Sequence, residues 1–138
     1  MTEYKNGILV DTSVWIDFFN NKDSVHSNLL ASFIENDESI FICPVIYQEI
    51  LQGIRDDKKC EKIKRIILSF NILNDNIMFI TNEAIDLYIN LRKKGITIRK
   101  SVDCLIASYA LANNLHLFFI DKDFENIYKN TEMKIIEA

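Results

Sequence analysis

The chain has 138 residues, of which 49% are hydrophobic, and it contains only three glycines and one proline. This composition suits a single globular domain over residues 1–138 and excludes collagen-like, low-complexity and disordered chains. The net charge of −4, from 20 acidic and 16 basic residues, neither supports nor excludes a nucleic-acid partner, because metal ions bound at an acidic site would cancel the excess.

Short apolar runs alternate with helical patterns along the chain. Proline 44 ends one run and suits the first turn of a helix, and Thr81 and Gly95 suit the start and the end of another. Continuous apolar strands that alternate with helices predict a doubly wound α/β fold, with a parallel sheet of four to five strands flanked by helices. We expect strands at 7–10, 39–43, 76–80, 115–120 and 133–136, and helices at 14–19, 25–36, 44–55, 58–70, 81–94, 101–114 and 121–128.

Three features predict the compartment. Residues 1–7 are polar and contain no apolar signal-peptide core, and the longest apolar runs, 40–46 and 115–120, are too short to cross a bilayer. The cysteines, Cys43, Cys60 and Cys104, are widely spaced and form no CxxC pair. We therefore expect a cytoplasmic protein with reduced thiols and no membrane contact, and neither a zinc site nor a disulfide framework.

Four acidic residues are candidates for a functional site, and an ordinary structural role must be considered for each of them. Asp11 and Asp121 follow the first and fourth expected strands, where aspartate is also a common helix cap. Asp103 falls in the first turn of a helix, where the helix dipole favours a carboxylate. Glu49 lies deeper in its helix and has no basic residue three or four positions away, so it needs a cation from elsewhere.

The four acids together are more informative than any one of them. The carboxyl ends of parallel strands form the sites of such folds, so these carboxylates are expected to converge there. Clustered carboxylates repel one another unless a divalent ion neutralises them. Oxygen-only ligands suit Mg²⁺ or Mn²⁺, and such an ion can activate water and stabilise charge on a phosphate.

The segments that carry these acids are similar to those of a known family. In order and spacing, the sequences Leu-Val-Asp-Thr-Ser, Glu-Ile-Leu-Gln-Gly, Asp-Cys-Leu-Ile-Ala and Asp-Lys-Asp-Phe resemble the motifs of PIN-domain nucleases; they occupy residues 9–13, 49–53, 103–107 and 121–124. Over essentially its full length the chain resembles the VapC-type toxins of prokaryotic toxin–antitoxin pairs. The resemblance implies a Mg²⁺- or Mn²⁺-dependent endoribonuclease that cleaves RNA, forms a homodimer and is inhibited by a cognate antitoxin protein.

The resemblance also implies roles for single residues. Ser13 would support the site by hydrogen bonding, and Asp123 would be an outer acid, although an acid in the first turn of a helix explains Asp123 equally well. Many relatives carry Thr or Ser two residues before the fourth acid, where this chain has Phe119, so a supporting hydrogen bond would be lost. The metal ligands would be Asp11, Glu49, Asp103 and Asp121.

Basic residues near the third acid are candidates for substrate contact. Arg99 and Lys100 come shortly before Asp103 and should lie at the mouth of the site, where they are as suited to contact RNA phosphates as to remain solvated.

Other function classes fit less well. The Asp121-Lys-Asp123 pattern resembles that of haloacid-dehalogenase-type phosphatases, but that fold needs most of its chain after the motif, and only fifteen residues follow Asp123 here. A response-regulator receiver needs an acidic pair after its first strand, whereas Asp11 is followed by Thr12 and Ser13. His26 and His116 lack partners for a metal-free histidine ribonuclease. A non-catalytic binding module of the same fold and a DNA-directed nuclease remain as alternatives.

Overall fold

The computed structural model describes residues 4–138, so the first three residues of the polar N-terminal segment lie outside the described part. Five strands form one parallel sheet in the order β3-β2-β1-β4-β5. The strands are β1 (Ile8–Val10), β2 (Ile40–Ile42), β3 (Asn71–Ile72), β4 (His116–Phe118) and β5 (Lys134–Ile135). The described residues also form the helices α1 (Thr12–Phe19), α2 (Val25–Glu35), α3 (Pro44–Gln52), α4 (Asp57–Leu68), α5 (Ile77–Lys93), α6 (Ser101–Ala112) and α7 (Phe124–Lys129).

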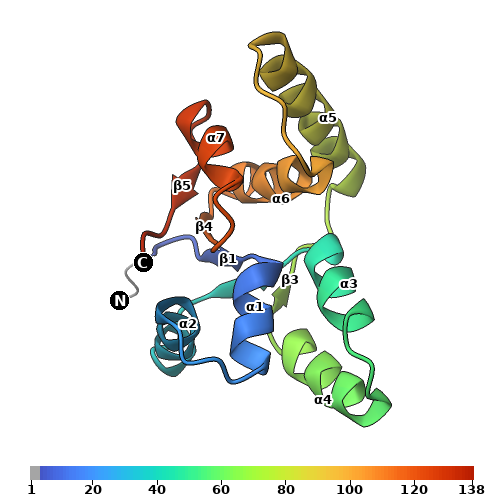
Figure 1. The fold of residues 1–138 in the computed structure, drawn as a ribbon, viewed down its shortest axis with the longest axis vertical. Coiled ribbons are helices and arrows are strands. Elements are labelled where there is room, and N and C mark those ends of the chain that lie inside the picture. The colour runs from blue at the N-terminus through green and yellow to red at the C-terminus, as the bar shows by residue number, and fades with distance from the viewer. Residues whose placement is uncertain (1–3) are drawn as a thin grey trace.

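The helices cover the sheet on both sides, which confirms the doubly wound α/β fold predicted from the sequence. In Figure 1, helices α1, α2 and α4 lie below β1, α5, α6 and α7 lie above it, and α3 lies to the right of β3. The chain runs from β1 outward to β2 and β3 and then crosses back to β4 on the other side of β1. Strand order therefore reverses between β1 and β4, and in such sheets this reversal opens a crevice at the carboxyl ends of the two strands.

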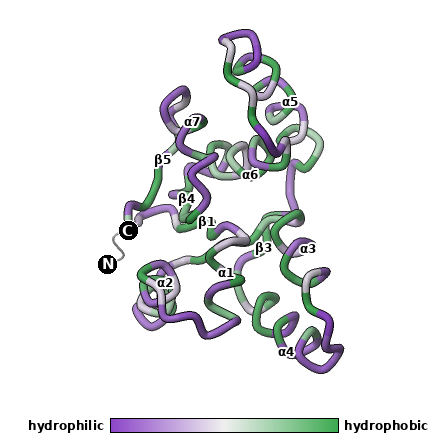
Figure 2. The backbone as a smooth tube through the Cα atoms, in the orientation of Figure 1, coloured by the Kyte–Doolittle hydropathy of each residue, from purple (hydrophilic) through white to green (hydrophobic). Residues whose placement is uncertain are grey.

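The strands are short, and the central strand β1 is buried on both faces. Ile8, Leu9 and Val10 have no exposed surface, which explains why β1 reads as a continuous apolar run. The hydropathy colouring of Figure 2 places hydrophobic segments along the sheet and on the inner sides of the helices. Trp15 of α1 packs against Phe70, which lies between α4 and β3, with ring centroids 5.4 Å apart. This packing fixes α1, the helix that follows the first acid.

The third predicted strand is wrong. Residues 76–80 begin α5, and the third strand of the sheet is the two-residue β3 directly after α4. The apolar run from Ile77 to Ile80 follows a helical period, because Ile80 is 2% exposed whereas Met78 and Phe79 are 70% and 60% exposed. An apolar run of this length fits a strand and a helix equally well, and two residues are too few for β3 to show a pattern.

Two of the helix ends differ from the prediction and one confirms it. Thr81 lies inside α5 and donates its hydroxyl to the carbonyl of Ile77, so it does not cap the helix. Helix α7 starts at Phe124, so Asp121 belongs to the loop before it. Gly95 has a φ of +82° and ends α5 as predicted. The amide of Gly95 bonds to Arg92 and the next amide bonds to Leu91, the paired bonds of a Schellman motif.

Cys43, Cys60 and Cys104 are free thiols. Among residues 4–138, no helix combines the length and the apolar character that crossing a membrane requires.

Candidate active site

The first acid stands where strand order reverses. Asp11 follows β1 directly, and its amide donates a 2.9 Å hydrogen bond to the carbonyl of Phe118 at the end of β4. Its carboxylate caps α1, accepting from the amide of Ser13 at 3.2 Å and from the Ser13 hydroxyl at 2.6 Å. The cap explanation for Asp11 is therefore correct, and the same side chain also lies in the crevice.

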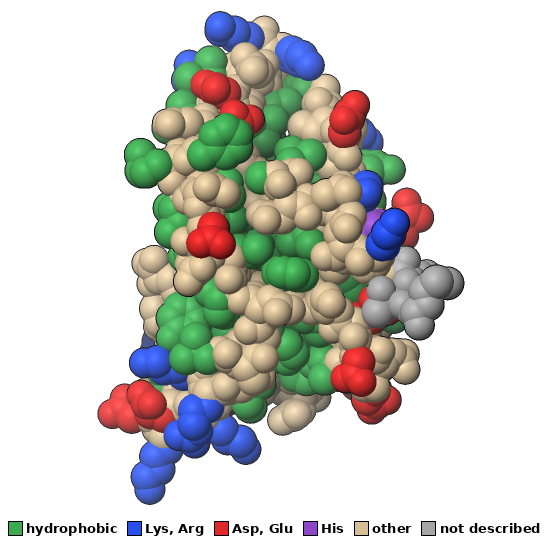
Figure 3. Space-filling view, turned by 180° about the vertical axis from the view of Figure 1, so that it is seen from behind, with side chains coloured by type: hydrophobic (Ala, Val, Ile, Leu, Met, Phe, Trp, Pro, Cys, Tyr) green, Lys and Arg blue, Asp and Glu red, His purple; other side chains and the backbone are tan. Residues whose placement is uncertain are grey.

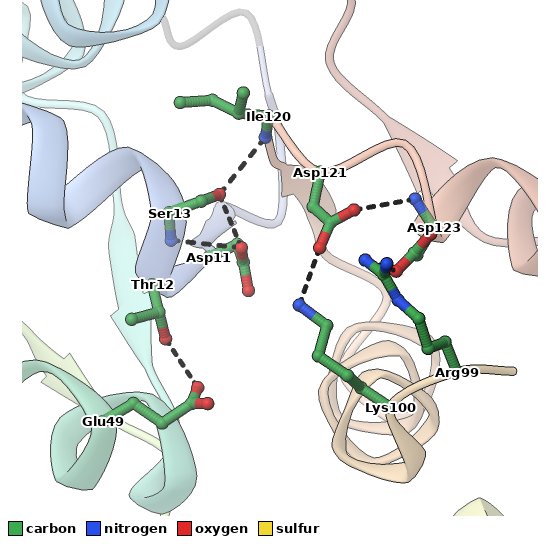
Figure 4. Close-up of polar contacts among 9 residues, drawn as sticks. All are labelled: Asp11, Thr12, Ser13, Glu49, Arg99, Lys100, Ile120, Asp121 and Asp123. Carbon is green, nitrogen blue, oxygen red and sulfur yellow. Dashed lines mark hydrogen bonds and ion pairs between the residues drawn. The ribbon is translucent and has the colours of Figure 1, made fainter.

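Ser13 connects the two strands that flank the crevice. While its hydroxyl donates to Asp11, its oxygen accepts a 3.3 Å hydrogen bond from the amide of Ile120. The contact holds the start of α1 against the loop that carries Asp121 (Figure 4). Ser13 therefore makes supporting hydrogen bonds of the kind that we expect for it from the sequence.

Asp103 is the most unusual acid of the site. Its residue is 3% exposed, and its Oδ2 atom is buried and has no hydrogen-bond partner among the described residues. Burial raises the pKa of Asp103 to about 7; Lys100 opposes this rise, and the charges of Asp11 and Asp121 add to it. A helix-dipole explanation does not account for a buried carboxylate oxygen with no partner, which normally costs free energy.

Asp121 and Asp123 each pair with a basic residue from the loop before α6. Lys100 donates a 2.7 Å hydrogen bond to Oδ2 of Asp121, and Arg99 donates a 3.0 Å bond to Asp123. The Lys100 hydrogen bond lowers the pKa of Asp121 and raises that of Lys100. The structure thus places Arg99 and Lys100 at the site, as expected, but in ion pairs that the sequence did not predict.

Three of the acids come within reach of one ion. Asp103, Asp121 and Asp123 each offer a carboxylate oxygen, and these oxygens lie within 4.8 Å of one another. Asp123 is therefore part of the cluster and not a first-turn acid, since it precedes α7 and makes no cap hydrogen bond. An oxygen-only set with an unpartnered buried member fits Mg²⁺ or Mn²⁺.

Asp11 and Glu49 lie beside this triad and are not members of it. Burial raises the pKa of Asp11, the Ser13 hydrogen bonds lower it, and the charge of Glu49 raises it further. In Figure 4 both carboxylates point toward the space in front of Asp121 and Lys100. The crevice therefore concentrates negative charge from both halves of the sheet.

Glu49 finds its partner on another helix. Its Oε1 accepts a 2.8 Å hydrogen bond from the hydroxyl of Thr12, the first residue of α1. The sequence predicted that Glu49 has no partner within its own helix, and this is correct. Thr12 was missed, because the only sequence signal for it is its place next to Asp11.

Phe119, two residues before Asp121, has an apolar role. Its ring packs against Phe124 with centroids 5.1 Å apart, so it supports the start of α7 by packing. The histidines stay out of the site, since His26 stacks on Phe118 and His116 lies in β4 against Tyr4.

The sheet and its acidic crevice define a doubly wound α/β protein with a candidate divalent-metal centre. The PIN domain family matches residues 8–130 of the chain, and the chain belongs to this family.

Curated relatives and solved structures agree with this membership. Ribonuclease VapC11 of Mycobacterium tuberculosis and the VapC ribonuclease Mb1587 of Mycobacterium bovis are each 29% identical to the chain over 128 residues, which are 92% of this chain and 96% of theirs. VapBC2 from Rickettsia felis, bound to a DNA fragment of its promoter, has a similar fold, with a TM-score of 0.72 at 21% identity over 94% of this chain and 96% of that one. A toxin–antitoxin complex from Klebsiella pneumoniae gives a TM-score of 0.73 at 19% identity and the same coverage.

Proposed function

We propose that this PIN-domain protein is a Mg²⁺- or Mn²⁺-dependent endoribonuclease and the toxin of a toxin–antitoxin pair. The observation that carries the proposal is the buried, unpartnered carboxylate oxygen of Asp103 beside Asp121 and Asp123. The ribonuclease names of the two mycobacterial relatives support the choice of RNA. The chain would act as one domain over its 138 residues.

The acids would share the work of holding a metal ion. Asp103, Asp121 and Asp11 would be ligands together with Glu49, and Asp123 is close enough to Asp103 and Asp121 to join them. Such an ion would supply positive charge for the scissile phosphate and for the attacking water molecule. The protein's own contribution is to hold the carboxylates in place, through Ser13 on Asp11 and Thr12 on Glu49.

The basic residues at the mouth suit a nucleic-acid backbone. The side chains of Arg99 and Lys100 are 76% and 49% exposed, so they can reach a bound phosphate while their backbone stays next to α6. Phosphate contacts of this kind position a nucleic acid without reading its sequence. Arg99 and Lys100 therefore position the substrate, and the acids carry the chemistry.

The partners follow from two surfaces. A groove of about 280 Å³ between α1, α3 and α4 is lined by apolar residues such as Ile16 and Ile50 and by charged residues such as Lys59, and it suits an amphipathic antitoxin segment. Such a segment would place a basic side chain on the carboxylates, where arginine can pair with two oxygens at once. A complex in which the antitoxin stays remote from Glu49 and Asp103 would contradict this part of the proposal.

A homodimer would use the other side of the molecule. At the start of α5, Ile77, Met78 and Phe79 are 44%, 70% and 60% exposed in succession. Figure 3 shows hydrophobic side chains gathered over much of the rear face, including its upper part, where α5 lies. Exposed apolar clusters of this kind commonly mark protein interfaces.

A cytoplasmic location is also part of the proposal, because the three free thiols suit a reducing compartment.

Purified protein tests the proposal most directly. Wild type should cleave RNA with Mg²⁺ or Mn²⁺, stop with EDTA, and stop when the protein encoded by the neighbouring gene is added. Asp103→Asn should lose several orders of magnitude in rate, because it weakens the metal ligation that the chemistry needs. Asp86→Asn is the matched control, since Asp86 is exposed on α5, and it should cleave at the wild-type rate.

Each alternative predicts a different result. Cleavage of single-stranded DNA in preference to RNA would favour a DNA-directed nuclease. Full activity in a folded Asp103→Asn protein, or no cleavage of any nucleic acid by wild type, would favour a binding module.

A further inference from the structure

The ammonium group of Lys100 lies at the centre of the acidic crevice. It donates to Asp121 at 2.7 Å, and the charges of Asp103 and Asp11 also act on it. These three carboxylates come from α6 and from the ends of β4 and β1, so they face the ammonium from different elements. Figure 4 shows the Lys100 side chain reaching from the start of α6 into the space between Asp121 and Asp11.

Arg99, the neighbouring cation, is placed differently. Its side chain is 76% exposed and pairs with Asp123 at the rim, whereas that of Lys100 is 49% exposed and faces inward. Exposed ion pairs are weak and are screened by salt. Lys100 is therefore the cation that balances the charge at the centre of the site.

Both oxygens of Asp121 are already engaged. Oδ1 accepts a 3.0 Å hydrogen bond from the amide of Asp123, and Oδ2 accepts from Lys100. Each oxygen has a second lone pair, so a metal ion that binds Asp121 would share an oxygen with one of these two donors. The backbone amide is fixed by the loop, but the lysine side chain can rotate away, and an ammonium ion and a divalent ion on one carboxylate repel each other.

We propose that Lys100 is the resident counter-ion of the metal-free site, and that the divalent cation binds by displacing it. The inference rests on the proposed metal-dependent function and adds to it an exchange of Lys100 for the metal ion. Lys100 weakens the affinity for metal, and its displacement by metal releases a cation at the mouth of the site. Metal loading then prepares the contact with substrate phosphate.

Metal affinity measured without substrate tests this inference. Mn²⁺ is titrated by calorimetry into metal-free wild type, Lys100→Met and Lys122→Met. Methionine keeps much of the length of lysine without its charge. Lys122 is the matched control, because it is exposed in the loop between Asp121 and Asp123 and makes no ion pair among residues 4–138. It therefore reports the general effect of removing a positive charge near the site.

The expected result is an asymmetry between the two variants. Lys100→Met should bind Mn²⁺ at least tenfold more tightly than wild type, while Lys122→Met stays within about threefold, the range of long-range charge effects in salt solution. Equal affinity in the two variants, or weaker binding by Lys100→Met, overturns the inference but leaves the metal site intact. No Mn²⁺ binding by any of the three proteins overturns the metal-dependent function as well.

A second measurement uses the wild-type protein alone, so it does not depend on the folding of a variant. The side-chain ammonium signal of Lys100 in ¹⁵N-labelled wild type should be protected in metal-free protein by its hydrogen bond to Asp121. Saturation with Mg²⁺, which is diamagnetic, should move this signal to the position of a solvated lysine, while the Lys122 signal stays unchanged. A Lys100 signal that is unchanged at saturation overturns the displacement.

Discussion

The hydroxyl of Thr12 donates a 2.8 Å hydrogen bond to the carboxylate of Glu49, joining α1 to α3 across the mouth of the site. The contact holds Glu49 toward the other acids from a helix that otherwise offers it no polar partner. We therefore expect Thr12 to be a positioning residue that acts through Glu49.

Removing this hydroxyl should weaken the site without unfolding the protein. Thr12→Val keeps the shape of the side chain, so the free energy of unfolding should change by about 1 kcal/mol or less. The affinity for Mn²⁺ and the cleavage rate should fall by about tenfold or more, as is usual when the partner of a ligand is lost. Thr12→Ser, which keeps the hydroxyl, should restore both. A valine variant with wild-type affinity and rate would show that Glu49 holds its position without Thr12.

Metal-free protein should become less stable as the pH rises from 4 to 7. Burial raises the pKa of Asp103 to about 7, whereas an aspartate in the unfolded chain titrates near about 3.9. The folded state thus keeps a proton that the unfolded state releases in this window, so the stabilisation is complete below about pH 4 and is lost as the pH passes 7. The lowered pKa of Asp121 acts only below this window.

The size of this effect is measurable by chemical denaturation at several pH values in EDTA. Each unit of pKa shift corresponds to about 1.4 kcal/mol, so the loss should reach a few kcal/mol. Asp103→Asn should show a much smaller slope, and the raised pKa of Asp11 should account for what remains. At pH 7 the variant should be at least as stable as wild type. A variant with the full wild-type slope would exclude Asp103 as its source.

Divalent ions should stabilise the folded protein by mass action. Binding at one hundred times the dissociation constant contributes about 2.7 kcal/mol, so millimolar Mn²⁺ should raise the melting temperature by several degrees. Asp11→Asn should reduce this rise and Asp86→Asn should not. A melting temperature that is the same in Mn²⁺ and in EDTA for wild type would remove the basis for a metal site.

The exposed start of α5 should carry the homodimer. Phe79→Glu places a charge in the apolar cluster and should convert a dimer into a monomer in light scattering coupled to size exclusion. Val25→Glu is the control, because Val25 is 66% exposed on α2 and belongs to another surface, so this variant should stay dimeric. A Phe79→Glu variant that stays dimeric would place the interface elsewhere. A monomeric wild type would exclude the homodimer.

Most of the fold was predictable because its central strands β1, β2 and β4 are largely buried. Ile8, Leu9 and Val10 read as a strand without alternation, and the glycine at 95 marked the end of α5 correctly. The prediction of the third strand failed because residues 71 and 72 form a strand by pairing with Phe41 and Ile42 in β2. Pairing between distant segments leaves no local pattern in so short a strand.

The sequence predicted which acidic residues gather in the crevice, but not the contacts that they make there. Strand ends and spacing identified Asp11, Asp103 and Asp121, because topology brings such positions to one edge. The Lys100 ion pair and the Thr12 hydrogen bond depend on how helices approach across the crevice, and residues 12 and 49 give no sign of this in the sequence. Asp123 joined the cluster because α7 starts later than its sequence suggests.

The order of strands also determines when the site can exist during synthesis. The Asp11 amide and the Phe118 carbonyl that it contacts lie far apart in the sequence, and Asp121 comes shortly after Phe118. A ribosome must therefore release the chain beyond Asp121 before the two halves of the crevice can meet. A nascent chain that ends before Phe118 therefore cannot assemble the crevice, and we expect such a chain to bind no divalent ion there.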